Sequence, residues 1–391
     1  MNKQLDALAQ LKKVHSDIDP QAISILKRLK DAGFEAYLVG GCVRDLLVGI
    51  KPKDFDIATN ASPQEVKRKV PFSFIIGRRF KLVHTRRGEK IFEVATYRRQ
   101  ATDEELQNQE DQAIGDENFF GTLSEDSFRR DFTINAMYYD PISESFIDHC
   151  NGIADIATQT LRTIGHPSER IKEDPIRVLR ALRLSQKLGF TIENEFKSAI
   201  VENIEEIKRA ILPRRREEWI KFFRLASIDL ALIELYDLKI FEAILPTLHQ
   251  LFLDENKQDY FRGLIRRMKI VGFDMNDTYE LFAGVVYSYL LTQYEHPSLM
   301  NMNEISEKNE FQFFWKEELG VFKAEITAIE TAIKYMNAIR NIEAFEKKGE
   351  RRKRAMIYHP NFQLALKLGL LSNEFDSADF AFWMEQFEVL Q

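Results

Sequence analysis

The sequence has few of the features that mark secreted, membrane-spanning or strongly basic proteins. It contains two cysteines in 391 residues, Cys42 and Cys150, without metal-ligand spacing, which argues against a disulfide framework and favours a cytoplasmic location. No run approaches the ~18 apolar residues of a membrane span, and the amino-terminal stretch lacks a signal-peptide core. The formal net charge is −6, so any contact with RNA must come from local basic patches.

The familiar nucleotide-binding fingerprints are missing as well. The sequence has neither the GKS or GKT of a Walker loop nor the GxGxxG of a dinucleotide fold, and no RRM, KH or zinc-finger signature. Residues 38–57 instead read LVGGCVRDLLVGIKPKDFDI. A glycine turn, an Arg-Asp pair and two aspartates in this order are the layout that a nucleotidyl-transfer site needs.

The two aspartates are Asp54 and Asp56, two residues apart in a predicted strand, which places their side chains on one face. Adjacent carboxylates repel each other unless a cation lies between them, and Mg²⁺ prefers oxygen ligands and substrate phosphates. We therefore predict that this pair holds Mg²⁺, or Mn²⁺ in its place. The alternative is a solvated pair of loop aspartates.

Gly40 and Gly41 end one predicted strand and lead into a helix. They permit close approach of a phosphate, and free N–H groups lie at the start of the helix. Arg44, followed by Asp45, lies on the first turn, from which its guanidinium can reach phosphate oxygens. The alternative is an ordinary strand-turn-helix corner that binds no ligand.

Two further groups of charged residues adjoin apolar runs. Glu93 interrupts the strand pattern IFEVATY and is either a third carboxylate of the metal site or an exposed strand residue. The segment RRDFTINAMYYD puts Arg130 on the triphosphate, Asp131 in the catalytic pocket and Asn135 near the ribose. It could equally be a capped helix start that enters the core.

The segment EDPIRVLRALR begins a predicted helix in which Asp174, Arg177 and Arg180 share one face. A carboxylate can accept from the exocyclic amine of adenine or cytosine while an arginine donates to the neighbouring ring nitrogen. Guanine and uracil present the opposite polarity, so the pair would select A and C without separating them. The alternative is an intrahelical ion pair worth ~0.5 kcal/mol.

With these motifs the chain resembles the class II nucleotidyltransferases, which comprise bacterial poly(A) polymerases and tRNA CCA-adding enzymes. The matching segments between residues 35 and 190 are LVGGCVRD, KDFDIAT, RRDFTINAMYYD and EDPIRVLRALR. Three more segments, at 75–98, 117–140 and 351–371, resemble the poly(A) polymerase branch. The resemblance implies template-independent addition of AMP from ATP to RNA 3′ ends, with Asp54, Asp56 and Asp131 as active-site carboxylates.

The expected fold class is α+β, a small mixed-sheet head followed by an elongated all-helical body. Short β-rich runs occupy residues 36–97, and helical periodicity dominates after Asp174. The acidic, polar stretch 100–118 predicts a mobile loop. The expected domains are a catalytic head at 1–150, a helical neck for nucleotide and base recognition at 151–225, and a helical RNA-binding body at 226–391.

Local basic clusters are the candidate RNA contacts, because phosphates bind lysine and arginine. The residues concerned are Arg214, Arg215, Arg216, Arg351, Arg352 and Arg354. Each cluster could instead be a solvated helix face. Two further functions stay open: a CCA-adding or A-adding tRNA enzyme with the same head, and a non-catalytic RNA-binding or scaffold protein.

Overall fold

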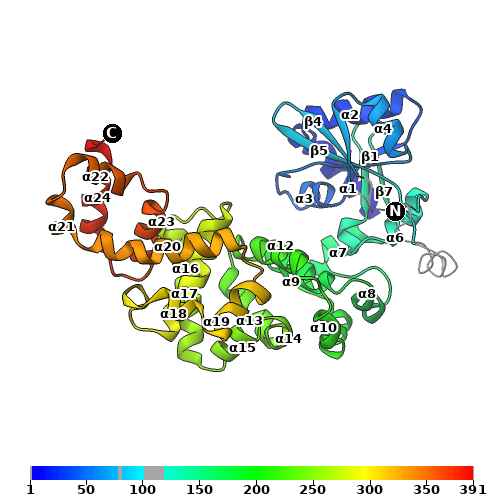
Figure 1. Ribbon diagram of the computed structural model, residues 1–391. Coiled ribbons are helices and arrows are strands. Elements are labelled where there is room, and N and C mark those ends of the chain that lie inside the picture. The colour runs from blue at the N-terminus through cyan, green and yellow to red at the C-terminus, as the bar shows by residue number, and fades with distance from the viewer. Residues whose placement is uncertain (1, 78–81, 101–118, 391) are drawn as a thin grey trace, which may run out of the picture. The chain divides into compact units, whose positions relative to one another are not determined.

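The chain divides into two compact units, each described by itself below. The computed structural model describes residues 2–77, 82–100 and 119–390 (Figure 1). Unit 1, the head, comprises Met1–Arg170 and Gly189–Phe196, and unit 2 comprises Ile171–Leu188 and Lys197–Gln391.

A seven-stranded mixed sheet forms the centre of the head, in the order β3-β4-β5-β2-β1-β6-β7. Neighbouring strands run antiparallel except for the parallel pair β2 and β5. The strands are β1 Ala36–Val39, β2 Asp56–Thr59, β3 Ser73–Ile76, β4 Leu82–Arg87, β5 Lys90–Thr96, β6 Met137–Asp140 and β7 Ser145–Asp148. A separate two-stranded sheet pairs β8 Thr160–Leu161 with β9 Thr191–Ile192.

One face of the seven-stranded sheet is covered by helices. Alternate strand residues such as Leu38, Ile57 and Val94 share a buried core with the apolar stripes of these helices. Capping side chains begin several of them: Asp19 caps α2 and Ser62 forms a capping box in α4, each followed by a proline. The head helices are α1 Asn2–Lys13, α2 Pro20–Asp31, α3 Gly41–Leu47, α4 Pro63–Lys69, α6 Leu123–Phe128 and α7 Gly152–Ala157.

Among the described residues, those that cover the opposite face of the sheet lie only over its β2-β1-β6 half. There Val39, Ala58, Tyr97 and Tyr138 form a small cluster, with Leu123 of α6 packed against it. Over β3, β4 and β5 the side chains of this face are exposed or partly exposed. This open face also carries Asp56 and Glu93, so the candidate carboxylates lie between a covered and an uncovered half.

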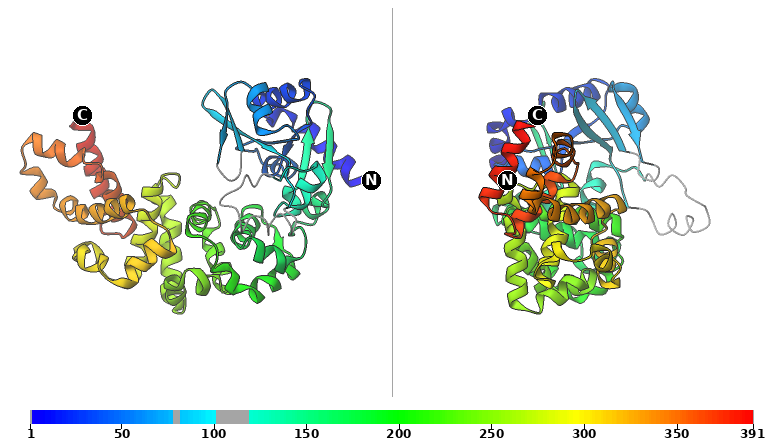
Figure 2. Two further views of the ribbon diagram at one scale, coloured as in Figure 1. Left: turned by 45° about the vertical axis from the view of Figure 1, so that its right-hand side comes forward. Right: turned by 60° about the vertical axis from the view of Figure 1, so that its left-hand side comes forward.

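Unit 2 contains helices only, among its described residues (Figure 2). Within this unit α9 packs on α12 and α13, α16 on α17, and α20 on α23. Two helices, α8 Pro167–Glu173 and α10 Asn194–Glu202, run from one unit into the other. The helices within unit 2 are α9 Ile176–Leu188, α11 Ile204–Ile207, α12 Leu212–Phe223, α13 Ile228–Asp237, α14 Ile240–Ile244, α15 Pro246–Phe252, α16 Glu255–Val271, α17 Thr278–Gln293, α18 Met302–Ser306, α19 Asn309–Gln312, α20 Lys323–Arg340, α21 Ile342–Glu346, α22 Glu350–Ile357, α23 Phe362–Leu371 and α24 Ser377–Val389.

The predicted fold class, a mixed-sheet head with a helical body, is confirmed. The predicted loop lies almost wholly at 101–118, outside the described residues, as do residues 78–81 of the β-rich stretch expected at 36–97. The division of the helical part at residue 225 stays a prediction. Within the described chain, no helix combines the length and apolar character required to cross a membrane.

Candidate functional site

Three carboxylates gather at the centre of the open sheet face. Strand β2 begins at Asp56, so Asp54 lies in the loop just before it, which corrects the prediction that both lie on the strand. The pairing of Ile57 with Val94 places Asp56 beside Glu93 of β5. Burial raises the pKa of Asp56 to about 6, the charges of Glu93 and Asp54 add to the rise, and Arg130 opposes it. Ionisation of Asp56 is therefore unfavourable in the folded head, mainly because of burial.

The glycine turn after β1 leaves space beside two arginines. Gly40 has φ 76° and ψ −129°, a conformation that side chains other than glycine rarely adopt. A Cβ atom on Gly40 would lie 3.5 Å from Nη1 of Arg130, and one on Gly41 would lie 3.5 Å from Nη2 of Arg44. The predicted phosphate-binding groups are thus brought together within the head.

Arg44 is the start of a chain of hydrogen bonds that links two of the predicted motifs. Its Nε donates to Oδ1 of Asp45 at 2.8 Å, and its Nη1 donates to Oδ1 of Asn135 at 2.6 Å. Nδ2 of Asn135 in turn donates to Oδ1 of Asp131 at 3.1 Å. Because Arg44 and Asn135 are buried, these contacts fix the direction of both side chains. The ribose contact predicted for Asn135 stays a prediction.

Arg130 is held by Asp126, a buried residue that sequence reasoning missed. Nη2 of Arg130 donates to Oδ2 of Asp126 at 2.8 Å, and the hydroxyl of Tyr138 donates to the same oxygen at 2.7 Å. Burial alone would raise the pKa of Asp126, but the guanidinium groups of Arg130 and Arg129 lower it to about 2. Asp126 is therefore ionised and orients the arginine that was predicted to bind phosphate.

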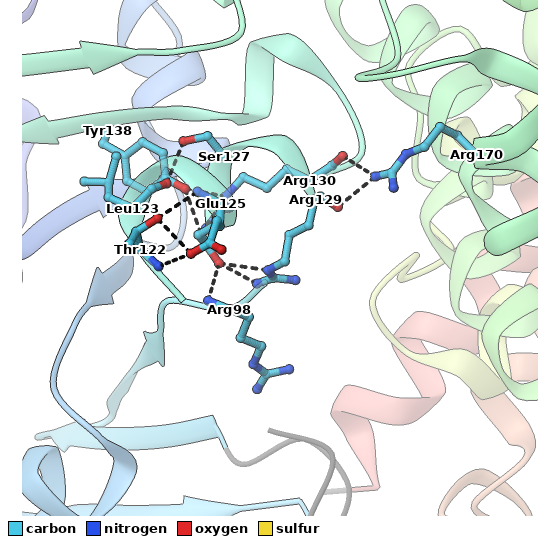
Figure 3. A network of polar contacts seen from close by, with 10 residues as sticks. Arg98, Thr122, Leu123, Glu125, Ser127, Arg129, Arg130, Tyr138 and Arg170 are labelled. Atoms are coloured by element: carbon cyan, nitrogen blue, oxygen red, sulfur yellow. Dashed lines mark hydrogen bonds and ion pairs between the residues drawn. The ribbon is translucent and has the colours of Figure 1, made fainter. Parts of the chain in front are cut away.

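Arg170 fixes the backbone of the same segment. Its Nη2 donates to the carbonyl oxygens of Arg129 and Arg130, at 2.7 Å each, as the right side of Figure 3 shows. The backbone N–H of Arg98 also donates to Asp126, at 3.1 Å. The Arg-Arg-Asp segment is thus held through both its side chains and its carbonyl groups.

The sequence contains a partial signal for this network. Asp126 precedes Arg130 by four residues, a spacing at which helical side chains meet, and Thr122 with Glu125 forms the capping box that begins α6. Nothing local points to Tyr138 or Arg170, because both reach the segment through tertiary contacts.

The predicted base-reading residues lie in unit 2, and each has another partner there. Oδ1 and Oδ2 of Asp174 accept from Nη1 and Nη2 of Arg214, at 2.7 and 2.9 Å. Arg177, which is buried, donates from Nη1 to Oε2 of Glu173 at 2.8 Å. Arg180 is partly exposed on the same helix, α9. The base-reading roles stay predictions.

The run of arginines at 214–216 lies only partly on the surface of unit 2: Arg214 is exposed, Arg215 is partly exposed and Arg216 is buried. Arg214 pairs with Asp174, and Arg215 donates to the carbonyl oxygens of Ile244 and Glu317, at 3.3 Å each. Arg216 is buried, donates to Glu325 at 2.7 Å and lies between two phenylalanine rings. The RNA contact predicted for Arg216 is therefore corrected to a packing role.

The second predicted basic cluster is on the surface of unit 2. Arg351, Arg352 and Arg354 are exposed on α22, where they can meet a phosphate chain.

The substitution Asp56→Asn should raise the stability of the head at pH 8 in the presence of EDTA. The pKa of Asp56 in the folded head is above its ordinary value. The carboxyl group therefore leaves the free energy of unfolding unchanged below pH ~4 and lowers it as the pH rises through ~6. The amide removes a cost on the order of 1–2 kcal/mol. Thermal unfolding at pH 4 and pH 8 checks this, with Glu89→Gln in the exposed β4–β5 turn as the control. Equal midpoints of Asp56→Asn and the unchanged protein at pH 8 would contradict it.

Asp126→Ala should destabilise the head by about 3–5 kcal/mol, because it leaves a partly buried guanidinium without its carboxylate. Urea titration followed by hydrogen exchange of β1 and β6 measures the cost. The control is Lys12→Ala, which removes an exposed ion pair with Glu144 and should cost under ~1 kcal/mol. If the two variants lose similar stability, Asp126 does not hold the segment together.

Comparisons with known proteins find two family models that match parts of the chain. The Poly A polymerase head domain matches residues 36–162, and the family described as "Probable RNA and SrmB- binding site of polymerase A" matches residues 189–252. Poly(A) polymerase I of Haemophilus influenzae is 37% identical over 261 residues, which cover 64% of this chain and 57% of that protein. The CCA-adding enzyme of Lactobacillus helveticus is 37% identical over 205 residues, which cover 52% of this chain and 50% of that protein.

Solved structures resemble the fold over nearly the whole chain. The Bacillus stearothermophilus CCA-adding enzyme in complex with CTP has a TM-score of 0.67 at 22% identity, covering 95% of this chain and 83% of that one. The Thermotoga maritima CCA-adding enzyme complexed with tRNA has a TM-score of 0.59 at 20% identity, covering 96% and 85%. The matched part spans little more than half the length of the poly(A) polymerases compared. The chain thus carries a match to the Poly A polymerase head domain and is similar in sequence to bacterial poly(A) polymerases and CCA-adding enzymes.

Proposed function

We propose that this protein is a poly(A) polymerase, an enzyme that transfers AMP from ATP to RNA 3′ ends without a template. The observation that carries the proposal is that the head brings the carboxylates of Asp56 and Glu93, with Asp54 just before the strand, together with the arginines next to the glycine turn. Negative charge beside phosphate-binding groups suits a reaction at a phosphorus atom assisted by a cation. The identity of 37% to poly(A) polymerase I over about two thirds of the chain supports the choice of ATP.

The carboxylates fit a divalent cation of the Mg²⁺ or Mn²⁺ type. Burial and like charge raise the pKa of Asp56, and a cation would reverse that effect. Among the described residues, no three Asp, Glu, His or Cys side chains come close enough to hold a metal by themselves. This agrees with Mg²⁺ chemistry, in which one or two carboxylates share the ion with substrate phosphates. Asp54 and Asp56 would hold the cation, which supplies charge neutralisation at the reacting phosphate.

The side chains of the head would bind and orient the triphosphate. Arg130, directed by Asp126, would neutralise phosphate oxygens, and the turn at Gly40 and Gly41 leaves room for them. Arg44 would join them while Asn135 and Asp131 hold its orientation. The RNA 3′ oxygen then bonds to the α-phosphorus as the bond to pyrophosphate breaks, a displacement that depends on alignment more than on covalent catalysis.

Base selection would come from Asp174 and Arg177, with Arg180 on the same helix. Arg214 holds both oxygens of Asp174 and thereby directs their remaining lone pairs. A carboxylate held in this way can accept from the amine of adenine or cytosine.

The exposed arginines of α22 would bind the RNA chain. The two free cysteines, Cys42 and Cys150, suit a reducing cytoplasm.

A CCA-adding tRNA enzyme is the second candidate. It is favoured by the identity to the Lactobacillus helveticus enzyme, and the proposed base-reading pair accepts cytosine as readily as adenine. The two candidates differ in product and not in the chemistry of the head.

Extension assays with two RNAs should separate the candidates. With ATP and Mg²⁺ we expect long ladders on an unstructured oligoadenylate, because a polymerase of this kind needs no tRNA shape. Addition that stops after two cytidines and one adenosine, and only on a tRNA without its CCA end, would identify the second candidate. Asp54→Ala and Asp56→Ala should abolish extension and keep the circular dichroism spectrum, and activity in either variant would refute the site assignment.

Asp174→Ala should reduce the preference for ATP over GTP about tenfold, because one hydrogen bond of the base-reading pair is lost. The ratio of kcat/KM for the two nucleotides measures the change. Asp259→Ala, which removes an Asp–Arg pair on the surface of α16, is the matched control and should leave the ratio unchanged. If Asp174→Ala keeps the wild-type ratio, base selection lies elsewhere.

A further inference from the structure

A row of neighbouring side chains leads from the carboxylates to the edge of the head sheet. Phe74 on β3 pairs with His84 on β4, and His84 pairs with Glu93 on β5. Glu93 lies beside Asp56 on β2 by the register of the parallel pair. Adjacent strands are about 4.8 Å apart, so Phe74 lies roughly 14 Å from Asp56 across three strand spacings.

Three large apolar side chains are exposed along this part of the open face. Phe74 is 57% exposed, Ile76 is 44% exposed and Ile91 is 56% exposed. Their neighbours in the same strands, such as Ser73 and Phe92, are buried on the helix-covered face. We call Phe74, Ile76 and Ile91 the β3–β5 strip. Exposed aromatic and apolar side chains on the face that carries a reaction centre are candidates for a binding surface.

The geometry of the proposed reaction determines which substrate can lie there. In an in-line displacement the attacking oxygen and the leaving pyrophosphate are on opposite sides of the α-phosphorus. The groups proposed to bind the triphosphate, Gly40, Arg44 and Arg130, adjoin β1 and β6 on one side of β2. An RNA 3′ end that approaches from the opposite side of β2 would pass over β5, β4 and β3.

We propose that the β3–β5 strip binds the last nucleotides of the RNA, with the Phe74 ring stacked on a base. The proposal rests on the nucleotidyl-transfer function proposed above. A stacked strand rises about 3.4 Å per nucleotide, so the distance from Asp56 to Phe74 corresponds to about four nucleotides. Aromatic stacking suits an RNA tail of any sequence, because every base offers a flat face. The exposed Arg86 on β4, next to Ile91 in the register, provides positive charge for the phosphates.

Fluorescence of the Phe74→Trp variant tests RNA binding without any requirement for catalysis. The three natural tryptophans are buried in unit 2, so a tryptophan at position 74 is the only one in the head. Titration with a six-nucleotide oligoadenylate should quench its emission to saturation, and titration with ATP alone should not. No quenching by the RNA would overturn the proposal, whether or not the protein extends RNA.

Steady-state kinetics then measure the contribution of the strip to the reaction. Phe74→Ala should raise the KM for the oligoadenylate about tenfold, the size expected for one lost stack, and leave the KM for ATP unchanged. Phe74→Trp should restore the KM for RNA. Ile91→Ala should raise it less, and the matched control Ile142→Ala, at a residue 45% exposed beyond β6, should not change it.

Two results would overturn the proposal and leave the proposed function intact. One is an active Phe74→Ala variant whose KM for RNA equals that of the wild type. The other is a Phe74→Ala variant that differs from the wild type in oligomeric state, measured by sedimentation, but has the same KM for RNA. That result would assign the strip to contacts between copies of the chain. If the wild-type protein extends no RNA at all, the proposed function fails, and quenching of Phe74→Trp still decides whether RNA binds the strip.

Discussion

The arrangement of the head depends on like charges held close together. Asp56 is partly buried beside Glu93, and Asp54 lies just before the strand, so the folded head keeps a carboxylate whose ionisation is unfavourable. A protein under selection for stability alone would replace one of these residues with a neutral one. The proximity of Asp56 and Glu93 on one sheet face, with Asp54 in the loop before it, is explained if a cation and a triphosphate complete the site.

Hydrogen bonds hold the two arginines of the site in fixed directions, whereas the ionisation of Asp56 is unfavourable. Arg130 is directed by Asp126 and Tyr138, and Arg44 by Asp45 and Asn135. Preorganised guanidinium groups lose little entropy when they meet phosphate oxygens, which is how such sites gain binding energy. In the proposed function the sheet would separate two tasks: the β1 and β6 side would hold the groups for the triphosphate, and the β3 to β5 side would offer apolar surface for RNA.

Two kinds of feature could be predicted from the sequence: secondary structure that shows a regular pattern, and site residues that lie close together along the chain. The α+β class followed from short β-rich runs and later helical periodicity, and the carboxylates, glycine turn and Arg-Arg-Asp segment were found as motifs. Asp126, Tyr138 and Arg170 were missed as a network because tertiary contacts bring them together. Arg216 was misjudged for the same reason: a run of three arginines indicated a surface, but its packing against two phenylalanine rings is visible only in the fold.

The most direct test of the central claim follows the phosphorus atoms of ATP. RNA is incubated with ATP labelled at the α-phosphate or at the γ-phosphate, with the wild-type protein and with Asp56→Asn. Nucleotidyl transfer at these carboxylates predicts that only the α label enters RNA, that the γ label leaves as pyrophosphate, and that the variant transfers neither. Entry of the γ label into RNA, or undiminished transfer by Asp56→Asn, would contradict the account.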